Sequence, residues 1–172
     1  MTQRISAGIL LFRRAAAAGA GGGGVASPDG GLEVLLGHPG GPFFASRDLG
    51  SWSIPKGEAE PGEDLYDVAR REFGEETGHT APAPPAATPI PLGSVVQKGG
   101  KIVHGWALEG DLDPAAAVSN TFSMRWPPVV GAVTDFPEID RVAWFDPQEA
   151  RRRLKAAQAP FVDRLEETLD AR

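Results

Sequence analysis

Apolar residues near the start of the chain group into two short runs, each bounded by polar or charged positions. The runs are RISAGILLFRR, residues 4–14, and LEVLLGH, residues 32–38. Runs of this length that are apolar at most positions are typical of strands buried on both faces of a sheet. Residues 15–31 between them are mostly alanine and glycine, a composition that predicts a flexible loop insertion between the two strands.

The hydrophobic period changes to that of a helix further on, and the predicted helix runs from Asp64 to Thr77. Its apolar positions share one helical face and are Leu65, Val68, Ala69 and Phe73. Gly78 follows as a C-terminal cap. Before this helix, residues 52–54 are expected to form a short extended piece, and residues 57–62 are interpreted as a turn or loop.

The middle of the chain predicts one hairpin. A proline-rich connector, residues 81–89, precedes two apolar segments that Gly99 and Gly100 separate. This arrangement is typical of a strand, a tight turn and a second strand. Residues 111–138 are expected to be mostly irregular.

The last part of the chain predicts one short strand and two helices. The strand is residues 141–145, and Asp146 and Pro147 then provide an N-cap and a first helical position. A final helix is expected over residues 159–171, with Phe161, Leu165 and Leu169 on one face. The whole order predicts a single α+β domain, residues 1–172, in which helices flank a mixed sheet.

Composition narrows the function classes. The net charge of -6 disfavours a sequence-independent nucleic-acid binder, which would present a basic face. The chain has no cysteine, which excludes thiolate zinc sites and a cysteine nucleophile and fits a reducing cytoplasm. The first apolar run is too short for a signal peptide or membrane span, so we expect no membrane partner.

The predicted helix carries acidic residues where they are unfavourable. Glu72, Glu75 and Glu76 share one face, and each like-charge pair destabilises a helix by roughly 0.2–0.5 kcal/mol. They also lie near the negative end of the helix dipole, and Gly74 inside the helix costs about 1 kcal/mol relative to alanine. Several local preferences are violated together, which is typical of a functional site.

Two interpretations of this acidic face remain open. It could be a solvated surface that Arg70 and Arg71 neutralise in part. Alternatively, carboxylates on one helical face can hold a hard divalent cation such as Mg²⁺, which prefers oxygen ligands. The cation would remove the repulsion and form an electrophilic patch that suits phosphate groups.

Residues 57–79 resemble the Nudix box, the signature of the Nudix hydrolases. Every charged and glycine position of the box is present, and the matching residues are Gly57, Glu63, Arg71, Glu72, Phe73, Glu75, Glu76 and Gly78. His79 stands where the family usually has an apolar residue, which affects packing after the helix and not the carboxylates. The resemblance implies a Nudix fold, which is an α/β/α sandwich around a mixed sheet.

The resemblance also implies hydrolysis of the diphosphate linkage in a nucleoside diphosphate joined to another group, with Mg²⁺ or Mn²⁺. The residues that it assigns to the metal site are Glu72, Glu75, Glu76 and Gly57. Glu63 would support the metal or the catalytic water, and Arg71 would orient the carboxylates. The general base would be Glu72 or Glu76, and a carboxylate outside the box, Glu138 or Asp140, could contribute.

Substrate recognition is expected outside the box. Lys56 is the leading phosphate contact, and Lys98, Lys101 and His104 are weaker candidates. Two loops offer aromatic residues and arginines that suit base stacking and phosphate pairing, although they could equally fill a loop core. These residues are Phe43, Phe44, Arg47, Trp52, Phe122, Arg125 and Trp126.

The leading hypothesis is a hydrolase whose partner is a small nucleotide, either a dinucleoside polyphosphate or a nucleoside triphosphate; ADP-sugars are less favoured. More loosely, the chain is similar to Nudix hydrolases of diadenosine polyphosphates and to bacterial nucleoside-triphosphate pyrophosphohydrolases. The alternative is a Nudix-fold regulatory module that binds nucleotide without cleaving it, and a purely structural acidic domain is less favoured still. The chain is expected to act as a monomer or homodimer.

Overall fold

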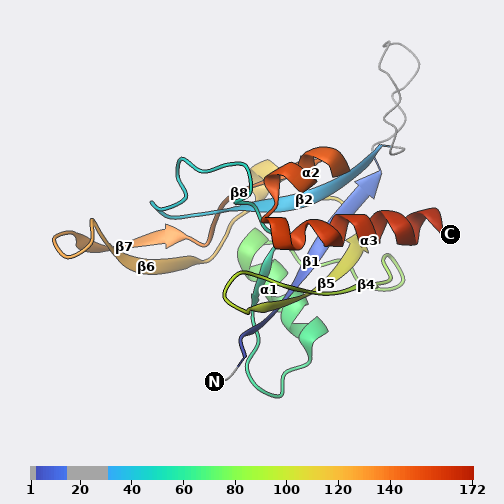
Figure 1. The fold of residues 1–172 in the computed structure, drawn as a ribbon, viewed down its shortest axis with the longest axis horizontal. Coiled ribbons are helices and arrows are strands. Elements are labelled where there is room, and N and C mark those ends of the chain that lie inside the picture. Colours follow the sequence, from blue (N-terminus) through green and yellow to red (C-terminus); the bar gives the residue numbers. More distant parts are fainter. Residues whose placement is uncertain (1–2, 15–30) are drawn as a thin grey trace, which may run out of the picture.

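A mixed β-sheet organises the chain, and the computed structural model describes it over residues 3–14 and 31–172 (Figure 1). The expected insertion at residues 15–31 therefore lies, apart from Gly31, outside the described residues. The strands of the main sheet are β1 (Ile5–Arg14), β2 (Leu32–Pro39), β3 (Lys56–Glu58), β4 (Ile90–Val96), β5 (Ile102–Glu109) and β8 (Ile139–Phe145). Their order is β4-β5-β1-β2-β8, with β3 paired to the first half of β1. Only the pairing of β1 with β5 is parallel, which confirms a mixed sheet.

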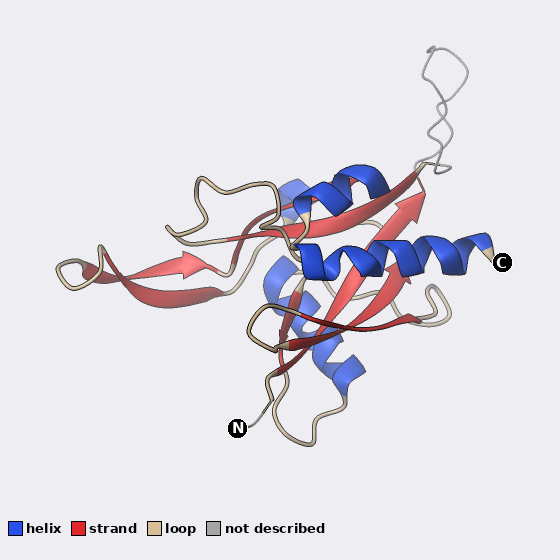
Figure 2. Cartoon of the chain, viewed as in Figure 1, coloured by secondary structure: helices blue, strands red, loops and turns tan. Residues whose placement is uncertain are grey.

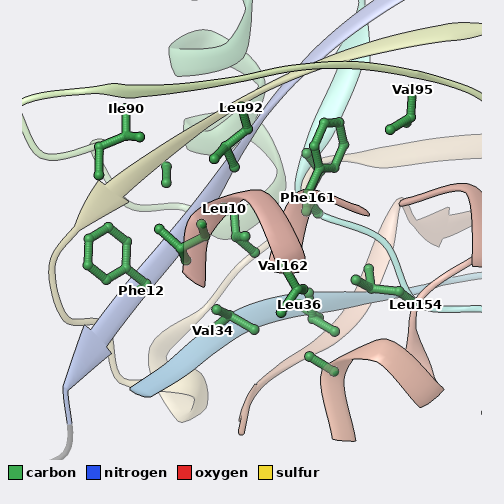
Figure 3. Packing of buried hydrophobic residues seen from close by; sticks show 14 of the residues in the cluster. Leu10, Phe12, Val34, Leu36, Ile90, Leu92, Val95, Leu154, Phe161 and Val162 are labelled. Atoms are coloured by element: carbon green, nitrogen blue, oxygen red, sulfur yellow. The ribbon is translucent and has the colours of Figure 1, made fainter. Parts of the chain in front are cut away.

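Helices cover both faces of this sheet (Figure 2). They are α1 (Leu65–Thr77), α2 (Pro147–Arg153) and α3 (Ala159–Asp170), with short 3-10 turns η1 (Pro114–Ala116) and η2 (Ala156–Gln158). Side chains alternate along a strand, so β1 serves two cores: Ile9 packs with α1, while Leu10 packs with α2 and α3. Figure 3 shows Phe161 and Val162 of α3 against Leu10 and Leu36. The near-continuous apolar runs of β1 and β2 follow from burial on both faces.

Helix α1 begins and ends where the sequence predicts. The side chain of Asp64 accepts a hydrogen bond from the backbone N–H of Asp67 at 3.0 Å, which caps the N-terminus. Gly78 has a φ of 75°, a left-handed conformation that favours glycine, and its N–H bonds to the carbonyl of Gly74. The two caps fix which turn of the helix carries the box glutamates.

Replacement of Asp64 by alanine is expected to lower the free energy of unfolding by about 1 kcal/mol, because the backbone N–H of Asp67 at the start of α1 loses its acceptor. Asp64→Asn is the control, since asparagine caps almost as well. Urea unfolding of both variants checks the prediction. Equal stability of the alanine and asparagine variants would contradict it.

The stretch that follows the predicted hairpin differs from the sequence prediction. Residues 111–138 were expected to be irregular, but they contain a second sheet formed by β6 (Thr121–Trp126) and β7 (Ala132–Pro137). This hairpin projects from the body of the molecule (Figure 1). Its strands are largely exposed, so they lack the strong apolar alternation that marks a half-buried strand. Phe122 and Met124 lie on one face of β6, but two such residues are too few to predict a strand from the sequence.

The remaining elements confirm the predicted α+β domain. Asp146 caps α2 through the N–H of Glu149 at 2.8 Å, with Pro147 at the first helical position. Phe161 and Leu165 of α3 are fully buried. Over residues 3–14 and 31–172, no helix has the length and apolar character needed to cross a membrane.

Candidate active site

The C-terminal half of α1 meets strand β3. The backbone N–H of Lys56 donates to Oε2 of Glu76 at 2.9 Å. A Cβ atom at position 57 would lie 2.0 Å from the carboxylate carbon of Glu72, so any larger residue there would displace the Glu72 carboxylate. Residues 56–58 are thus a strand paired to β1, whereas the sequence analysis expected a turn or loop from residue 57. This pairing fixes the backbone against which both carboxylates lie.

Glu72 and Glu76 are unusual carboxylates. Burial raises the pKa of Glu76 to about 8, with the charges of Glu72 and Glu138 adding to the rise. Burial also raises the pKa of Glu72, and the charge of Glu75 adds to that rise. Desolvation and nearby negative charge both disfavour the ionised form of an acid. Nearby positive charge therefore compensates the negative charge of Glu72 and Glu76 only in part.

Arg71 connects the start of the box to its end. It donates to Glu63 at 2.6 Å and lies 3.6 Å from Glu72. The hydrogen bond from Arg71 lowers the pKa of Glu63, so Glu63 stays ionised over the neutral range. Arg71 thus pairs with Glu63 and Glu72, and no ion pair with Glu75 is found among the described residues.

The two candidate carboxylates outside the box, Glu138 and Asp140, have different surroundings. Glu138 acts electrostatically on both Glu72 and Glu76 and lines a cleft with Glu76. Asp140 is instead engaged by His38, whose Nδ1 lies 2.8 Å from Oδ1 of Asp140. Of these two carboxylates, Glu138 is the one whose charge raises the pKa values of Glu72 and Glu76.

The cleft beside Glu76 has a volume of about 130 Å³ and combines acidic and basic groups. Its charged lining residues are Lys56, Glu76, Glu138 and Lys155. Lys155 precedes η2, and its N–H donates to the carbonyl of Trp52 at 2.9 Å. The sequence analysis missed Lys155, because a lone lysine after an arginine-rich helix is indistinguishable from a solvated surface residue.

A divalent cation fits the chemistry of the carboxylate cluster. No three acidic or histidine side chains already stand in a metal-holding arrangement within residues 3–14 and 31–172. Glu76 is turned to the Lys56 N–H, and Glu75 is exposed. The donors nevertheless are carboxylate oxygens and the carbonyl of Gly57, the ligands that hard cations take. The raised pKa values of Glu72 and Glu76 mark negative charge that a cation would compensate.

The aromatic candidates are divided between surface and core. Trp52 is 2% exposed and its indole N–H donates to Asp48 at 2.8 Å. It therefore fills the core under its loop, which corrects the expectation that Trp52 stacks on substrate. Phe43 and Trp126 are 56% and 37% exposed, and their rings meet edge to face with centroids 5.2 Å apart.

The other candidate residues of these loops are placed as follows. Phe44 is half-buried, with the exposed guanidinium of Arg47 5.9 Å from its ring centroid. Phe122 lies 6.1 Å from Phe136 between ring centroids, and Arg125 donates to the carbonyl of Gly131. These contacts place Phe122 and Arg125 within the β6–β7 hairpin.

The three weaker basic candidates, Lys98, Lys101 and His104, lie at different places along the β4–β5 hairpin. Lys98 is exposed at the β4–β5 turn. His104 pairs in register with Ala7, on the α1 face of the sheet, and its ring stacks with Trp106 at 6.5 Å. Lys101 lies near Lys56, and burial, together with the charge of Lys56, lowers the pKa of Lys101.

Comparison with known proteins gives a consistent result. A model of the NUDIX domain matches residues 25–165. The chain is 34% identical over 109 residues to an 8-oxo-(d)GTP phosphatase of Mycolicibacterium smegmatis, covering 60% of this chain and 30% of that protein. It is 42% identical over 53 residues to an RNA pyrophosphohydrolase of Erythrobacter litoralis, covering 28% of this chain and 32% of that protein. The chain thus spans about a third of the length of these curated relatives.

Solved structures share the fold at low sequence identity. A C. elegans Ap4A hydrolase in a binary complex superposes with a TM-score of 0.60 and 19% identity, covering 97% of this chain and 99% of that one. The NUDIX domain of Shewanella oneidensis NrtR with ADP ribose gives a TM-score of 0.59 and 16% identity, covering 98% and 90%. With the box intact, the fold shared and residues 25–165 matched by the domain model, the chain belongs to the NUDIX domain family.

Proposed function

We propose that this chain hydrolyses the diphosphate linkage of a nucleotide with the help of a divalent cation. The observation that carries the proposal is the cluster of Glu72, Glu76 and Glu138 beside a cleft that also contains Lys56. Relatives named as a pyrophosphohydrolase and a phosphatase support the same reaction class. A solvated acidic face, the alternative interpretation, does not account for burial strong enough to raise the pKa of Glu76 to about 8.

Mg²⁺ or Mn²⁺ would be held by the acidic end of α1 and by strand β3. The residues proposed to hold it are Glu72, Glu75, Glu76 and the carbonyl of Gly57. A divalent cation in such a site stabilises the charge that develops on phosphate oxygens. The approach of Glu72 to Gly57 and the hydrogen bond from the Lys56 N–H to Glu76 support this set of donors.

The side chains of this site have separate roles in the proposed reaction. Water attacks phosphorus in line, one P–O bond forms, and the anhydride P–O bond breaks to release a phosphate-terminated leaving group. Glu72 and Glu76 are the two candidates to accept the proton of the attacking water. Arg71 and Glu63 act as positioning residues for Glu72 through their ion pair. The side chain of Lys56, which lines the cleft, supplies a positive charge to the phosphates.

A nucleoside triphosphate or dinucleoside polyphosphate is the favoured substrate class, and ADP-sugars are less favoured. Exposed Phe43 and Trp126, with half-buried Phe44, offer aromatic surface for a nucleobase. Arg47 beside Phe44 adds a positive charge.

Chromatographic separation of the products formed from a nucleotide panel tests the proposal. The panel contains ATP, diadenosine tetraphosphate and ADP-ribose, each assayed with Mg²⁺, with Mn²⁺ and with a chelator. We expect hydrolysis that requires the added cation. Nucleotide binding without hydrolysis of any member would instead favour the non-catalytic regulatory module.

Replacement of Glu138 by glutamine is expected to lower kcat about 10–100-fold, the range seen when groups that support metal ligands are removed. Asp140→Asn is the matched control, because the carboxylate of Asp140 contacts His38, whereas the charges that raise the pKa of Glu76 are those of Glu72 and Glu138. Its kcat is expected to fall by much less. Steady-state kinetics with Mg²⁺ check both variants, and a larger loss for Asp140→Asn would contradict the assignment.

A further inference from the structure

Three of the four lysines in the chain converge beside the cleft, although three different segments supply them. Lys56 belongs to β3, Lys101 precedes β5, and Lys155 precedes η2. Lys56 and Lys155 line the cleft together, and Lys101 lies near enough to Lys56 for the charge of Lys56 to act on it. The fourth lysine, Lys98, is exposed at the hairpin turn.

Strand register puts Lys56 and Lys101 on the same face of the sheet. Lys56 pairs with Gly8, and Val103 pairs with Ser6. Ser6 and Gly8 are two residues apart on β1, so they share a face. Lys101 is two residues before Val103 and therefore shares that face as well.

A buried glutamine holds the three segments together. Gln158 is 0% exposed, and its Oε1 accepts a hydrogen bond from the N–H of Ile54 at 3.0 Å. Its Nε2 donates to Oε1 of Gln97 at 2.7 Å, and Gln97 in turn donates its backbone N–H to the carbonyl of Lys101 at 2.8 Å. Gln158 also ends the η2 turn that begins after Lys155. Hydrogen bonds of a buried residue therefore hold together the three backbone segments that carry the lysines.

The amino groups of the three lysines are not held by carboxylates that the structure describes. None of the three lysines forms an ion pair with any carboxylate in the described ranges. Glu58, which favours the charged form of Lys101, is already bound by Arg4 at 3.0 Å. Burial lowers the pKa of Lys101 to about 8, and burial with the charge of Lys56 lowers that of Lys155. An anion between these amino groups would relieve their repulsion and desolvation.

We propose that Lys56, Lys101 and Lys155 together bind the phosphate groups that extend beyond the scissile linkage, so that the substrate carries a chain of at least three phosphates. This inference rests on the proposed function. The carboxylate cluster, its cation and Lys56 suffice for the two phosphates of the scissile link. A nucleotide with two phosphates and a sugar offers no further anionic group to Lys101 and Lys155, whereas a longer phosphate chain does.

Titration calorimetry in a chelator tests the proposal without turnover, with inorganic tripolyphosphate and inorganic pyrophosphate as probes. The variants are Lys101→Met and Lys155→Met, because methionine keeps most of the aliphatic stem. Lys98→Met, from the same hairpin as Lys101, is the matched control. The wild-type chain should bind tripolyphosphate more tightly than pyrophosphate. Each test variant should weaken tripolyphosphate binding about 10-fold, the loss of one charged hydrogen bond, and weaken pyrophosphate binding less. Lys98→Met should leave both affinities nearly unchanged.

Equal affinity of the wild-type chain for the two anions, or binding to neither, would overturn the proposal. Unchanged tripolyphosphate affinity in both test variants would overturn it as well. A free nucleoside triphosphate and a 5′-triphosphorylated oligonucleotide present the same phosphate chain, and a comparison of their KM values in Mg²⁺ identifies which source is preferred. Because calorimetry requires no catalysis, failure of this proposal is distinguishable from absence of hydrolysis in the nucleotide panel.

Discussion

Replacement of Glu76 by glutamine is expected to lower kcat by more than about 100-fold, because removal of a direct metal ligand should exceed the 10–100-fold effect of its supporting groups. Glutamine keeps the length of the side chain and one oxygen, which can still accept the hydrogen bond from Lys56. The variant therefore removes charge while it preserves the contact between α1 and β3. Steady-state hydrolysis of the best substrate in Mg²⁺ measures the effect.

The same substitution at Glu167 is the matched control. Glu167 is exposed on α3, and Glu167→Gln changes the net charge of the chain by the same amount. It should leave kcat and the Mg²⁺ requirement unchanged. If Glu76→Gln retained wild-type kcat, Glu76 would not be a metal ligand, and the proposed site would have to be reassigned.

The sequence was most informative where local chemistry and function coincide. Helix α1 could be bounded from Asp64 and Gly78 because capping depends on residue type over a few positions. The acidic face could be found because Glu72, Glu75 and Glu76 violate helix preferences together. Buried strands could be found because β1 and β2 are apolar at most positions.

Long-range features could not be predicted in the same way. The choice between Glu138 and Asp140 depends on where β8 begins and on the contact of Asp140 with His38. The approach of Lys101 and Lys155 to Lys56 depends on strand register and on the hydrogen bonds of Gln158. Both join segments far apart in the sequence, so a local sequence pattern cannot predict them. Trp52 was misassigned because an aromatic residue in a loop has the same sequence signature whether it stacks on ligand or fills the core.

The metal-free chain is expected to lose stability as pH rises from about 5 to 8. The ordinary pKa of Glu76 is 4.5, and burial raises it to about 8 in the folded chain. The folded state therefore binds more protons than the unfolded state in this window, so stability falls as pH rises. A shift of one pKa unit corresponds to about 1.4 kcal/mol, and even half of this shift would lower the free energy of unfolding by about 2 kcal/mol. Glu72, whose pKa is also raised, acts in the same direction.

Urea unfolding between pH 5 and pH 8, about the window set by the two pKa values of Glu76, measures this loss with a chelator and with Mg²⁺. Glu76→Gln should flatten the profile in chelator, whereas Glu167→Gln should keep the wild-type slope. Mg²⁺ should restore stability at the alkaline end for the wild type and do so much less for Glu76→Gln, because binding to the folded state alone stabilises it. The lowered pKa of Lys101, about 8, has the opposite sign and acts above this window. A stability profile that is flat and insensitive to Mg²⁺ would show that the repulsion among the box glutamates is relieved by something other than a cation.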